Sequence, residues 1–152
     1  MYWRGHVGIA LLAYAPVAGA VRVAGEPELA VLGAAVAVAF ATLPDLDHRL
    51  PVSHRGPTHT VAFTVAVGAV VAVATAAVRP PWTAAFVGGV AALSLTSHVA
   101  GDAITPMGIW PFRPLSERHV TLDLTPAANP RANRLFLGVG AAALALSVTL
   151  TP

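Results

Sequence analysis

The sequence predicts an all-α fold: a polytopic membrane helix bundle of about five transmembrane helices, in a single domain covering residues 1–152. Composition is the first reason, because 56% of the residues are hydrophobic and only 11% are charged, whereas a soluble domain carries about a quarter charged residues. Patterning is the second reason, because the apolar runs are continuous and approach the roughly 20 residues that span a bilayer as a helix. The strands of a membrane barrel would instead alternate apolar and polar residues.

Five apolar segments, separated by proline, glycine or charged residues, define the expected helices. Pro16 interrupts the first segment, and Pro44 ends or kinks the second, because proline lacks the N–H that an inner helical turn requires. Trp82 opens the fourth segment as an expected interfacial anchor. Small residues dominate every segment, which lets helix backbones approach closely in lipid. The expected spans are residues 7–24, 28–43, 60–78, 82–101 and 135–151.

The first segment admits a second interpretation, as a signal peptide. Arg4 precedes an apolar core, and residues 18–20 (AGA) would form a small-residue cleavage site. A membrane helix is favoured, because His6 would be lost with a discarded peptide. The connection over residues 102–134 contains five prolines and is expected to be a loop with short turns.

Arginine distribution predicts the orientation of the bundle. Five spans place the N-terminus and the polar connections 44–59 and 102–134 on one side, which then holds seven of the nine arginines. An excess of basic residues marks the cytoplasmic side, so the N-terminus is expected in the cytoplasm. The net charge is only +2, and the basic residues are explained by topology, so a nucleic-acid partner is not favoured. The seven are Arg4, Arg49, Arg55, Arg113, Arg118, Arg131 and Arg134.

A polar stretch between the second and third spans, LPDLDHRLPVSHRGPTHT at 43–60, contains two of the four aspartates and three of the six histidines. The same topology brings further His and Asp residues to this membrane face. His98 and Asp102, spaced i and i+4, share one helix face, and Asp45 with His48 could share another. Ionisable groups at a membrane edge are rare and usually functional. The residues that converge are His6, Asp45, His48, His59, His98 and Asp102.

These side chains predict a divalent-metal site at the cytoplasmic helix ends. The chain has no cysteine, and His with Asp ligands favours zinc, with manganese as an alternative, in a site of one to three ions. Such a site activates water near neutral pH and clamps the oxygens of a phosphoryl or acyl centre. Arg49, Arg55 and Arg113 could bind an anionic substrate such as a phosphate. Alternatively, these arginines could serve only to orient the protein in the membrane and to contact lipid headgroups.

In combination, these motifs resemble a known family. His6, LPDLDHR at 43–49, HRGPTHT at 54–60 and HVAGDAITPMGIWPF at 98–112 resemble the membrane-bound metal-dependent hydrolases, the YdjM-like inner-membrane group. The resemblance covers the chain from about His6 to Phe112. It implies metal-assisted hydrolysis in a prokaryotic inner membrane, with membrane lipid as a partner and without a defined substrate.

A looser likeness concerns the order of the ligands. Asp45 precedes His59 by fourteen residues, and His98 and Asp102 follow, an order similar to that of zinc-dependent phospholipase C and single-strand nuclease enzymes. This likeness implies that Asp45 bridges metals and that the other three are terminal ligands. His6 would bind a second metal, and phosphodiester or phospholipid hydrolysis is the favoured chemistry.

His119 and Asp123 could echo a later ligand pair of those enzymes, but the segment TLDLTP around Asp123 does not look helical, so both are left out of the core site. The predicted metal ligands are the six converging residues named above, with Asp47 as a further candidate. We assign catalytic roles to Asp45, Asp47 and Arg55, and binding of a lipid-linked or phosphorylated substrate to Arg49, His54 and Arg113.

Two other functions compete with the hydrolase. The first is a non-catalytic metal-binding protein, a scaffold or a transporter, although the middles of the third and fifth spans offer only Thr64, Thr75 and Ser147, so conduction is not favoured. The second is a structured loop that only orients the helices. The sequence sets no oligomeric state.

Overall fold

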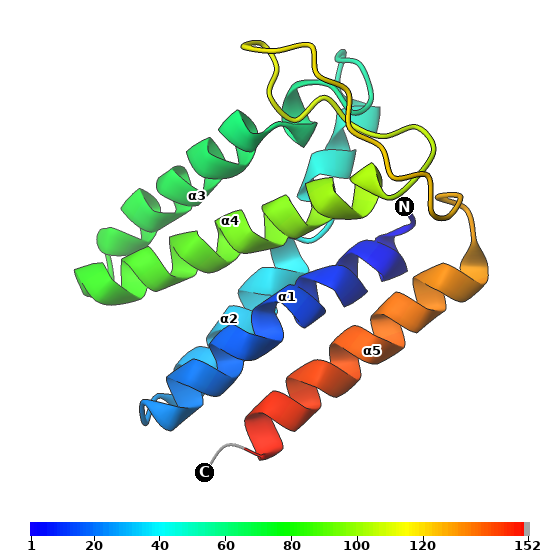
Figure 1. Cartoon of the computed structure of the whole chain (residues 1–152). Coiled ribbons are helices and arrows are strands. Elements are labelled where there is room, and N and C mark those ends of the chain that lie inside the picture. Colours follow the sequence, from blue (N-terminus) through cyan, green and yellow to red (C-terminus); the bar gives the residue numbers. More distant parts are fainter. Residues whose placement is uncertain (151–152) are drawn as a thin grey trace.

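A computed structural model describes residues 1–150 and confirms the all-α class (Figure 1). Two 3-10 helices, η1 and η2, lie between the second and third α-helices, and an isolated antiparallel bridge joins Ile109 to Val120 in the long connection. The elements are α1 (Trp3–Val23), α2 (Pro27–Phe40), η1 (Leu43–Arg49), η2 (Pro57–His59), α3 (Val61–Ala76), α4 (Pro81–Ala103) and α5 (Pro130–Thr149).

Helix α1 is the central element of the bundle. It packs against α5, α2 and α4, and α3 packs on α4 as the second arm of an antiparallel pair (Figure 1). The polar connections η1–η2 and 104–129 lie together at one end of the bundle, beside the N-terminus (Figure 1). The number of spans predicted that these three parts of the chain would share one side.

Four helical segments are long and apolar enough to cross a membrane: α1, α4, α5, and α2 continued by η1 as Pro27–Arg49. Helix α3 has 16 residues, and at about 1.5 Å per residue it is shorter than a hydrocarbon core of about 30 Å. The expected 60–78 span is therefore shortened at both ends. Its start is fixed by Thr60, whose Oγ1 accepts a hydrogen bond from the Phe63 N–H at 3.1 Å.

Two further features of the helices differ from the sequence prediction. Helix α1 continues through Pro16 without interruption, because membrane helices tolerate proline where neighbouring helices and local adjustments satisfy the freed backbone groups. Helix α5 starts at Pro130 rather than 135, because the side chain of Asn129 caps it by accepting from the N–H groups of Arg131 and Ala132. The predicted end of that span, Thr151, lies outside the described residues.

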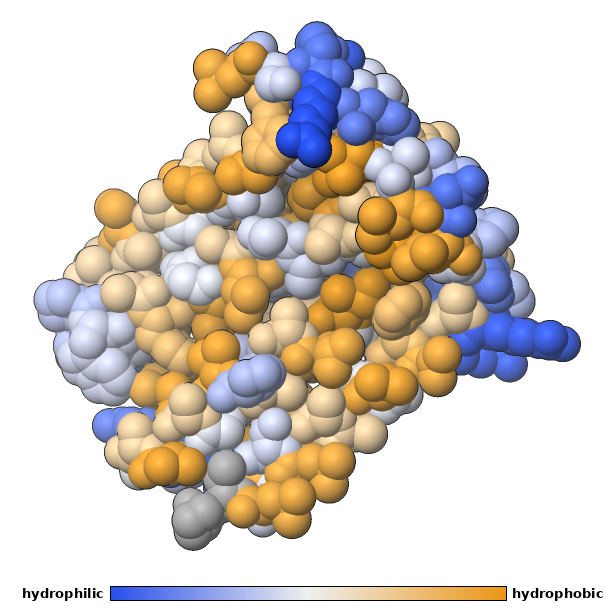
Figure 2. All heavy atoms as spheres, in the orientation of Figure 1, coloured by the Kyte–Doolittle hydropathy of each residue, from blue (hydrophilic) through white to orange (hydrophobic). Residues whose placement is uncertain are grey.

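The polarity of the molecule is inverted relative to a soluble domain. Large apolar side chains point outward from the helices, among them Val31, Val65 and Val73, each more than half exposed. Figure 2 shows the apolar residues spread over the helices and the hydrophilic ones gathered over the loop end. Histidine, aspartate and arginine side chains are instead buried at that end. This distribution suits a bundle whose outer surface meets lipid.

Glycines allow close backbone approach at two helix–helix contacts. A Cβ at Gly140 of α5 would collide with the Gly8 backbone of α1, and a Cβ at Gly88 of α4 would lie 2.5 Å from the Gly68 carbonyl oxygen of α3. Small residues of this kind let helices pack backbone to backbone, which is the main source of attraction between helices in lipid.

Replacing Gly140 with valine is expected to lower the free energy of unfolding by about 1–3 kcal/mol, the usual cost of overpacking, because α5 must move away from α1. Gly138→Val is the matched control on the same helix, since a Cβ at Gly138 meets nothing within 4 Å. Helical circular dichroism during denaturant titration in detergent measures both variants. Equal losses of stability would contradict the contact.

Candidate metal centre

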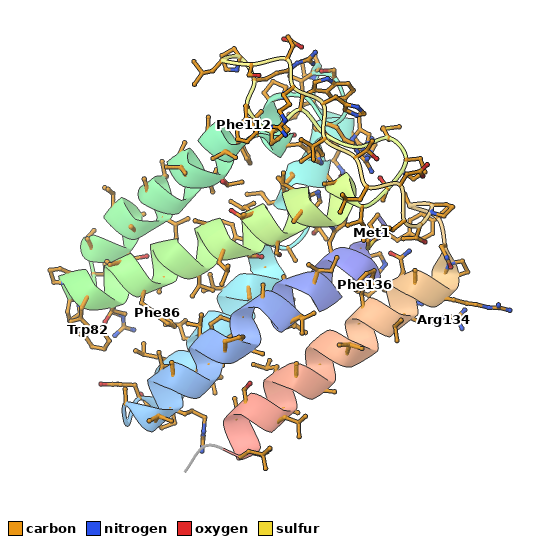
Figure 3. The ribbon with its side chains drawn as sticks, viewed as in Figure 1. Met1, Trp82, Phe86, Phe112, Arg134 and Phe136 are labelled. Carbon is orange, nitrogen blue, oxygen red and sulfur yellow. The ribbon has the colours of Figure 1, made fainter. Side chains whose placement is uncertain are left out.

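Four elements meet at the loop end of the bundle and supply five His and Asp side chains. The first turns of α1, the 3-10 helices η1 and η2, and the last turns of α4 converge there, beside the amino terminus labelled at Met1 in Figure 3. The convergence predicted for residues almost a hundred positions apart is therefore present. The five side chains are His6 (α1), Asp45 (η1), His59 (η2), His98 and Asp102 (α4).

Asp47 folds the segment between η1 and η2 back onto the bundle. Its carboxylate is 1% exposed and accepts hydrogen bonds from His54 Nδ1 at 3.0 Å, the Arg55 N–H at 3.0 Å and Thr58 Oγ1 at 3.2 Å. Arg55 itself has a positive φ of 58°, a conformation that a non-glycine residue adopts only when its surroundings impose it. The loop is thus held in a defined shape, with His59 directed inward.

Nitrogen and oxygen atoms of the five side chains lie 3.1–3.6 Å from one another in neighbouring pairs. His59 Nε2 is 3.1 Å from His98 Nε2 and 3.3 Å from Asp102 Oδ2. His6 Nε2 is 3.4 Å from Asp102 Oδ1, and His98 Nε2 is 3.6 Å from Asp45 Oδ1. Tetrahedral ligands bound at about 2.0–2.1 Å lie about 3.3–3.4 Å apart. The set His6, Asp45, His98 and Asp102 could therefore hold a metal ion, with His59 adjoining it.

Hydrogen bonds on the far side of two rings fix which nitrogen faces the centre. His98 Nδ1 donates to the Ala41 carbonyl at 2.7 Å. His59 Nδ1 lies 3.0 Å from Thr58 Oγ1, whose hydroxyl donates to Asp47, so this Nδ1 also carries the proton. With both rings neutral, the two Nε2 atoms then present lone pairs to each other at 3.1 Å. That arrangement is unfavourable in a buried site unless a proton or a metal ion lies between the two nitrogens, and anchoring of Nδ1 in this way is how metal-binding histidines are usually oriented.

Unsatisfied polar atoms support the same assignment. Among the described residues, both ring nitrogens of His6 and Oδ2 of Asp102 are buried without a hydrogen-bond partner, a state that normally costs free energy. Burial by itself lowers the pKa of His59, but the adjacent Asp102 and Asp45 carboxylates outweigh burial and raise that pKa above its ordinary value. The residues present thus fit a bound cation in both chemistry and charge.

Arg55 is a partner of Asp102. Its guanidinium is buried and donates to Asp102 Oδ1 at 3.0 Å, to Thr105 Oγ1 at 2.9 Å and to the Gly108 carbonyl at 3.0 Å. The amino group of Met1 lies 2.6 Å from the same Oδ1. These contacts fix Asp102 and the loop after α4. The catalytic role that the sequence suggested for Arg55 stays a prediction.

A second, more exposed group adjoins the buried one. Asp45, Asp47, His48 and His54 have ligand atoms within 4.8 Å of one another, and the His48 and His54 rings stack at 4.0 Å. Asp45 is common to both groups, as a bridging ligand would be. The oxygens of Asp47 are already engaged by the loop, so the buried group is the better metal site. His48 therefore lies in the outer group and does not touch the buried centre.

The structure leaves several predicted residues outside both groups. Arg113 is partly exposed, forms an ion pair with Glu117 and lies over the Trp110 ring. Arg49 is exposed at the end of η1. His119 contacts the Met107 carbonyl at 2.9 Å in the long connection, in agreement with its exclusion, as for Asp123, from the core site.

Sequence reasoning missed two threonines that orient the ligands. Thr58 joins His59 to Asp47, and Thr105 receives the Arg55 guanidinium while donating to the Asp102 carbonyl at 2.8 Å. A signal was present for both: Thr58 directly precedes a candidate ligand, and Thr105 follows Asp102 by three residues. Hydroxyls so placed can bond to the backbone or side chain of the neighbouring helix turn.

Comparison with known proteins adds one finding to this geometry. A family model described as YdjM inner membrane protein matches residues 1–151. No curated protein and no solved structure matches the chain. The match extends over all five helices and both groups of His and Asp residues.

Proposed function

This chain belongs to the YdjM inner membrane protein family, and from that premise we propose that it is a membrane-embedded, divalent-metal-dependent hydrolase. The substrate class we propose is a phosphoester or a lipid-linked compound, and zinc is favoured over manganese. One observation carries the proposal: the His59 and His98 Nε2 atoms face each other at 3.1 Å between two aspartates, in a membrane protein. The family and the apolar helices indicate a multi-pass inner-membrane location.

The buried residues would hold the ion, and Asp45 marks the accessible edge. His6, His59, His98 and Asp102 are fully buried, whereas the Asp45 side chain is 25% exposed. A bound divalent ion supplies a water nucleophile near neutral pH and stabilises charge on the substrate oxygens. Asp45 would be the residue placed to act as general base, because its carboxylate lies at the solvent-accessible edge of the proposed centre.

Substrate would approach from the η1–η2 side. His54 is partly exposed next to Asp45 and Asp47, and Arg49 is exposed on η1, so both could contact an anionic headgroup. We place this side at the cytoplasmic face on the ground of the seven arginines near it. A headgroup at the membrane surface would reach the site without leaving the bilayer.

A structural metal ion, without catalysis, is the second candidate function of the site. The burial of four of the five ligands favours it, because a closed site is typical of structural metal ions. An ion there would join α1, η1, η2 and α4. Transport is not favoured, since the exposed face of the bundle is apolar along the spans.

Asp45→Asn is expected to lower hydrolytic activity by about 10²-fold or more, the usual contribution of a general base, with the helical fold intact. Purified protein in detergent is assayed with bis(p-nitrophenyl) phosphate and with phospholipid in mixed micelles, before and after chelation and after addition of Zn²⁺ or Mn²⁺. Metal content is measured by inductively coupled plasma mass spectrometry. Asp123→Asn is the matched control, because Asp123 lies in the 104–129 connection, outside both His/Asp groups.

The outcomes separate the candidates. Metal-dependent hydrolysis that is lost in Asp45→Asn supports the hydrolase. The structural role is supported if the protein binds stoichiometric metal, hydrolyses neither substrate and loses thermal stability after chelation. If the wild-type protein binds no divalent metal, both the hydrolase and the structural metal site are excluded.

A further inference from the structure

A large groove lies at the end of the bundle opposite to the metal centre. It has a volume of about 800 Å³, within the range of about 300–1,000 Å³ that is typical of ligand sites. Its walls are the start of α2, the end of α3 and the start of α4, where Trp82 lies in Figure 3. Helices α2 and α3 each pack on α4 rather than on each other, and this separation leaves the groove between them.

The groove combines an apolar interior with a charged rim. Leu29, Leu32, Val71 and Val87 are among its wall residues. Its rim carries two carboxylates, Glu26 and Glu28, and one guanidinium, Arg79, all exposed. In the part of the chain that the structure describes, no ion pair or side-chain hydrogen bond is present for any of the three. These exposed groups are therefore available to pair with a bound headgroup.

We propose that this groove binds a phospholipid whose headgroup carries both an amine and a phosphate. The ammonium would pair with Glu26 and Glu28, and the phosphate with Arg79, in charge-assisted hydrogen bonds. An acyl chain would cover the wall residues, and Trp82, 55% exposed at the rim, would lie at headgroup depth. The proposal concerns a site remote from the metal centre and does not depend on the proposed hydrolysis.

The rim charges favour this lipid over other occupants. Two carboxylates against one guanidinium disfavour a headgroup that carries only negative charge. A second copy of the chain seated in the groove would bury its apolar walls but would leave the rim charges desolvated, which costs free energy unless they are paired. A headgroup with both signs of charge satisfies all three.

Bromine quenching of Trp82 fluorescence tests the proposal directly. The chain has three tryptophans, so Trp3→Phe with Trp110→Phe leaves Trp82 as the sole emitter. The protein is placed in vesicles of equal mole fractions of phosphatidylethanolamine and phosphatidylglycerol, with brominated chains on one lipid or on the other. We expect the amine lipid to be enriched about fivefold over the anionic lipid next to Trp82. This ratio corresponds to a free-energy difference of about 1 kcal/mol, as for an exposed ion pair.

Three variants in that background sharpen the result. Glu26→Gln combined with Glu28→Gln should equalise quenching by the two lipids, and Glu117→Gln, at the other end of the molecule, should leave the preference unchanged. Ala74→Phe places an aromatic ring in the groove from an exposed wall position and should reduce quenching by both lipids. Circular dichroism checks the fold of each variant.

Two results would overturn the proposal. The first is equal quenching by both lipids in the protein with intact glutamates, or a preference that persists in the double glutamine variant. The second is Trp82 shielded from both brominated lipids together with a dimeric mass in detergent, which would assign the groove to a second copy of the chain.

Discussion

Asp102→Asn is expected to abolish metal binding and to lower the free energy of unfolding by about 3–5 kcal/mol, the usual cost of breaking a buried ion pair. Asp102 is fully buried, 3.0 Å from Arg55 Nη2, and within 3.4 Å of both His6 and His59. Asparagine has the same shape but no charge. The Arg55 guanidinium would then be buried without its counter-ion, and two histidines would lose their common carboxylate.

A double variant separates these two effects. In Asp102→Asn combined with Arg55→Met, the uncompensated charge is gone, so part of the stability should return while the metal stays lost. Glu117→Gln is the matched control, because Glu117 forms an ion pair with Arg113 on the exposed surface and exposed pairs contribute little. Metal content and denaturant unfolding are measured on all four proteins. Full metal content in Asp102→Asn would contradict the assignment of this carboxylate as a ligand.

His59→Ala combined with His98→Ala is expected to reduce bound metal to background. Loss of a single orienting partner costs about 10–100-fold in metal affinity, and here two direct nitrogen ligands are removed, so the loss should be larger. Each ring has its Nδ1 anchored, to Thr58 and to the Ala41 carbonyl respectively, which directs its Nε2 at the centre. Titration with a zinc-binding dye in competition measures the affinity.

His119→Ala controls for the general effect of removing a histidine, since His119 contacts the Met107 carbonyl in the long connection and belongs to neither group. Circular dichroism distinguishes loss of the site from loss of the fold. A double alanine variant that keeps its helices and its metal would show that the ion binds elsewhere, for which the outer group with His48 and His54 is the next candidate.

Much of this arrangement follows from the sequence, because it depends on properties of whole segments. Apolar composition and continuous runs predict membrane helices, and the number of spans decides which connections share a side. That count places His6, His59 and the His98–Asp102 pair at one end before any contact is known. The i, i+4 spacing of the pair also predicts that its side chains share one helix face, and in the structure His98 Nε2 lies 3.7 Å from Asp102 Oδ2.

The orientation of η1 could not be predicted in this way. In a 3-10 helix residues three apart lie on the same side, and the packed side of η1 carries Pro44 and Asp47, both buried. The rotation of η1 about its axis is set by the packing of α2 on α1 and α4. As a result, Asp47 points inward and holds the loop, while His48 is exposed. Sequence spacing alone could not choose between the two faces.

Hydrophobicity and connectivity act along the chain, so the sequence was sufficient to predict the fold class, the apolar helices and the end of the bundle at which the His and Asp residues gather. Only the tertiary structure decided which of those residues touch, that Arg55 and Asp47 fix the ligands, and that α2 and α3 separate into a groove. These depend on backbone approach at glycines such as Gly8 and Gly140 and on the buried hydrogen bonds of Asp47 and Asp102. Both are relations between distant segments that no local pattern encodes.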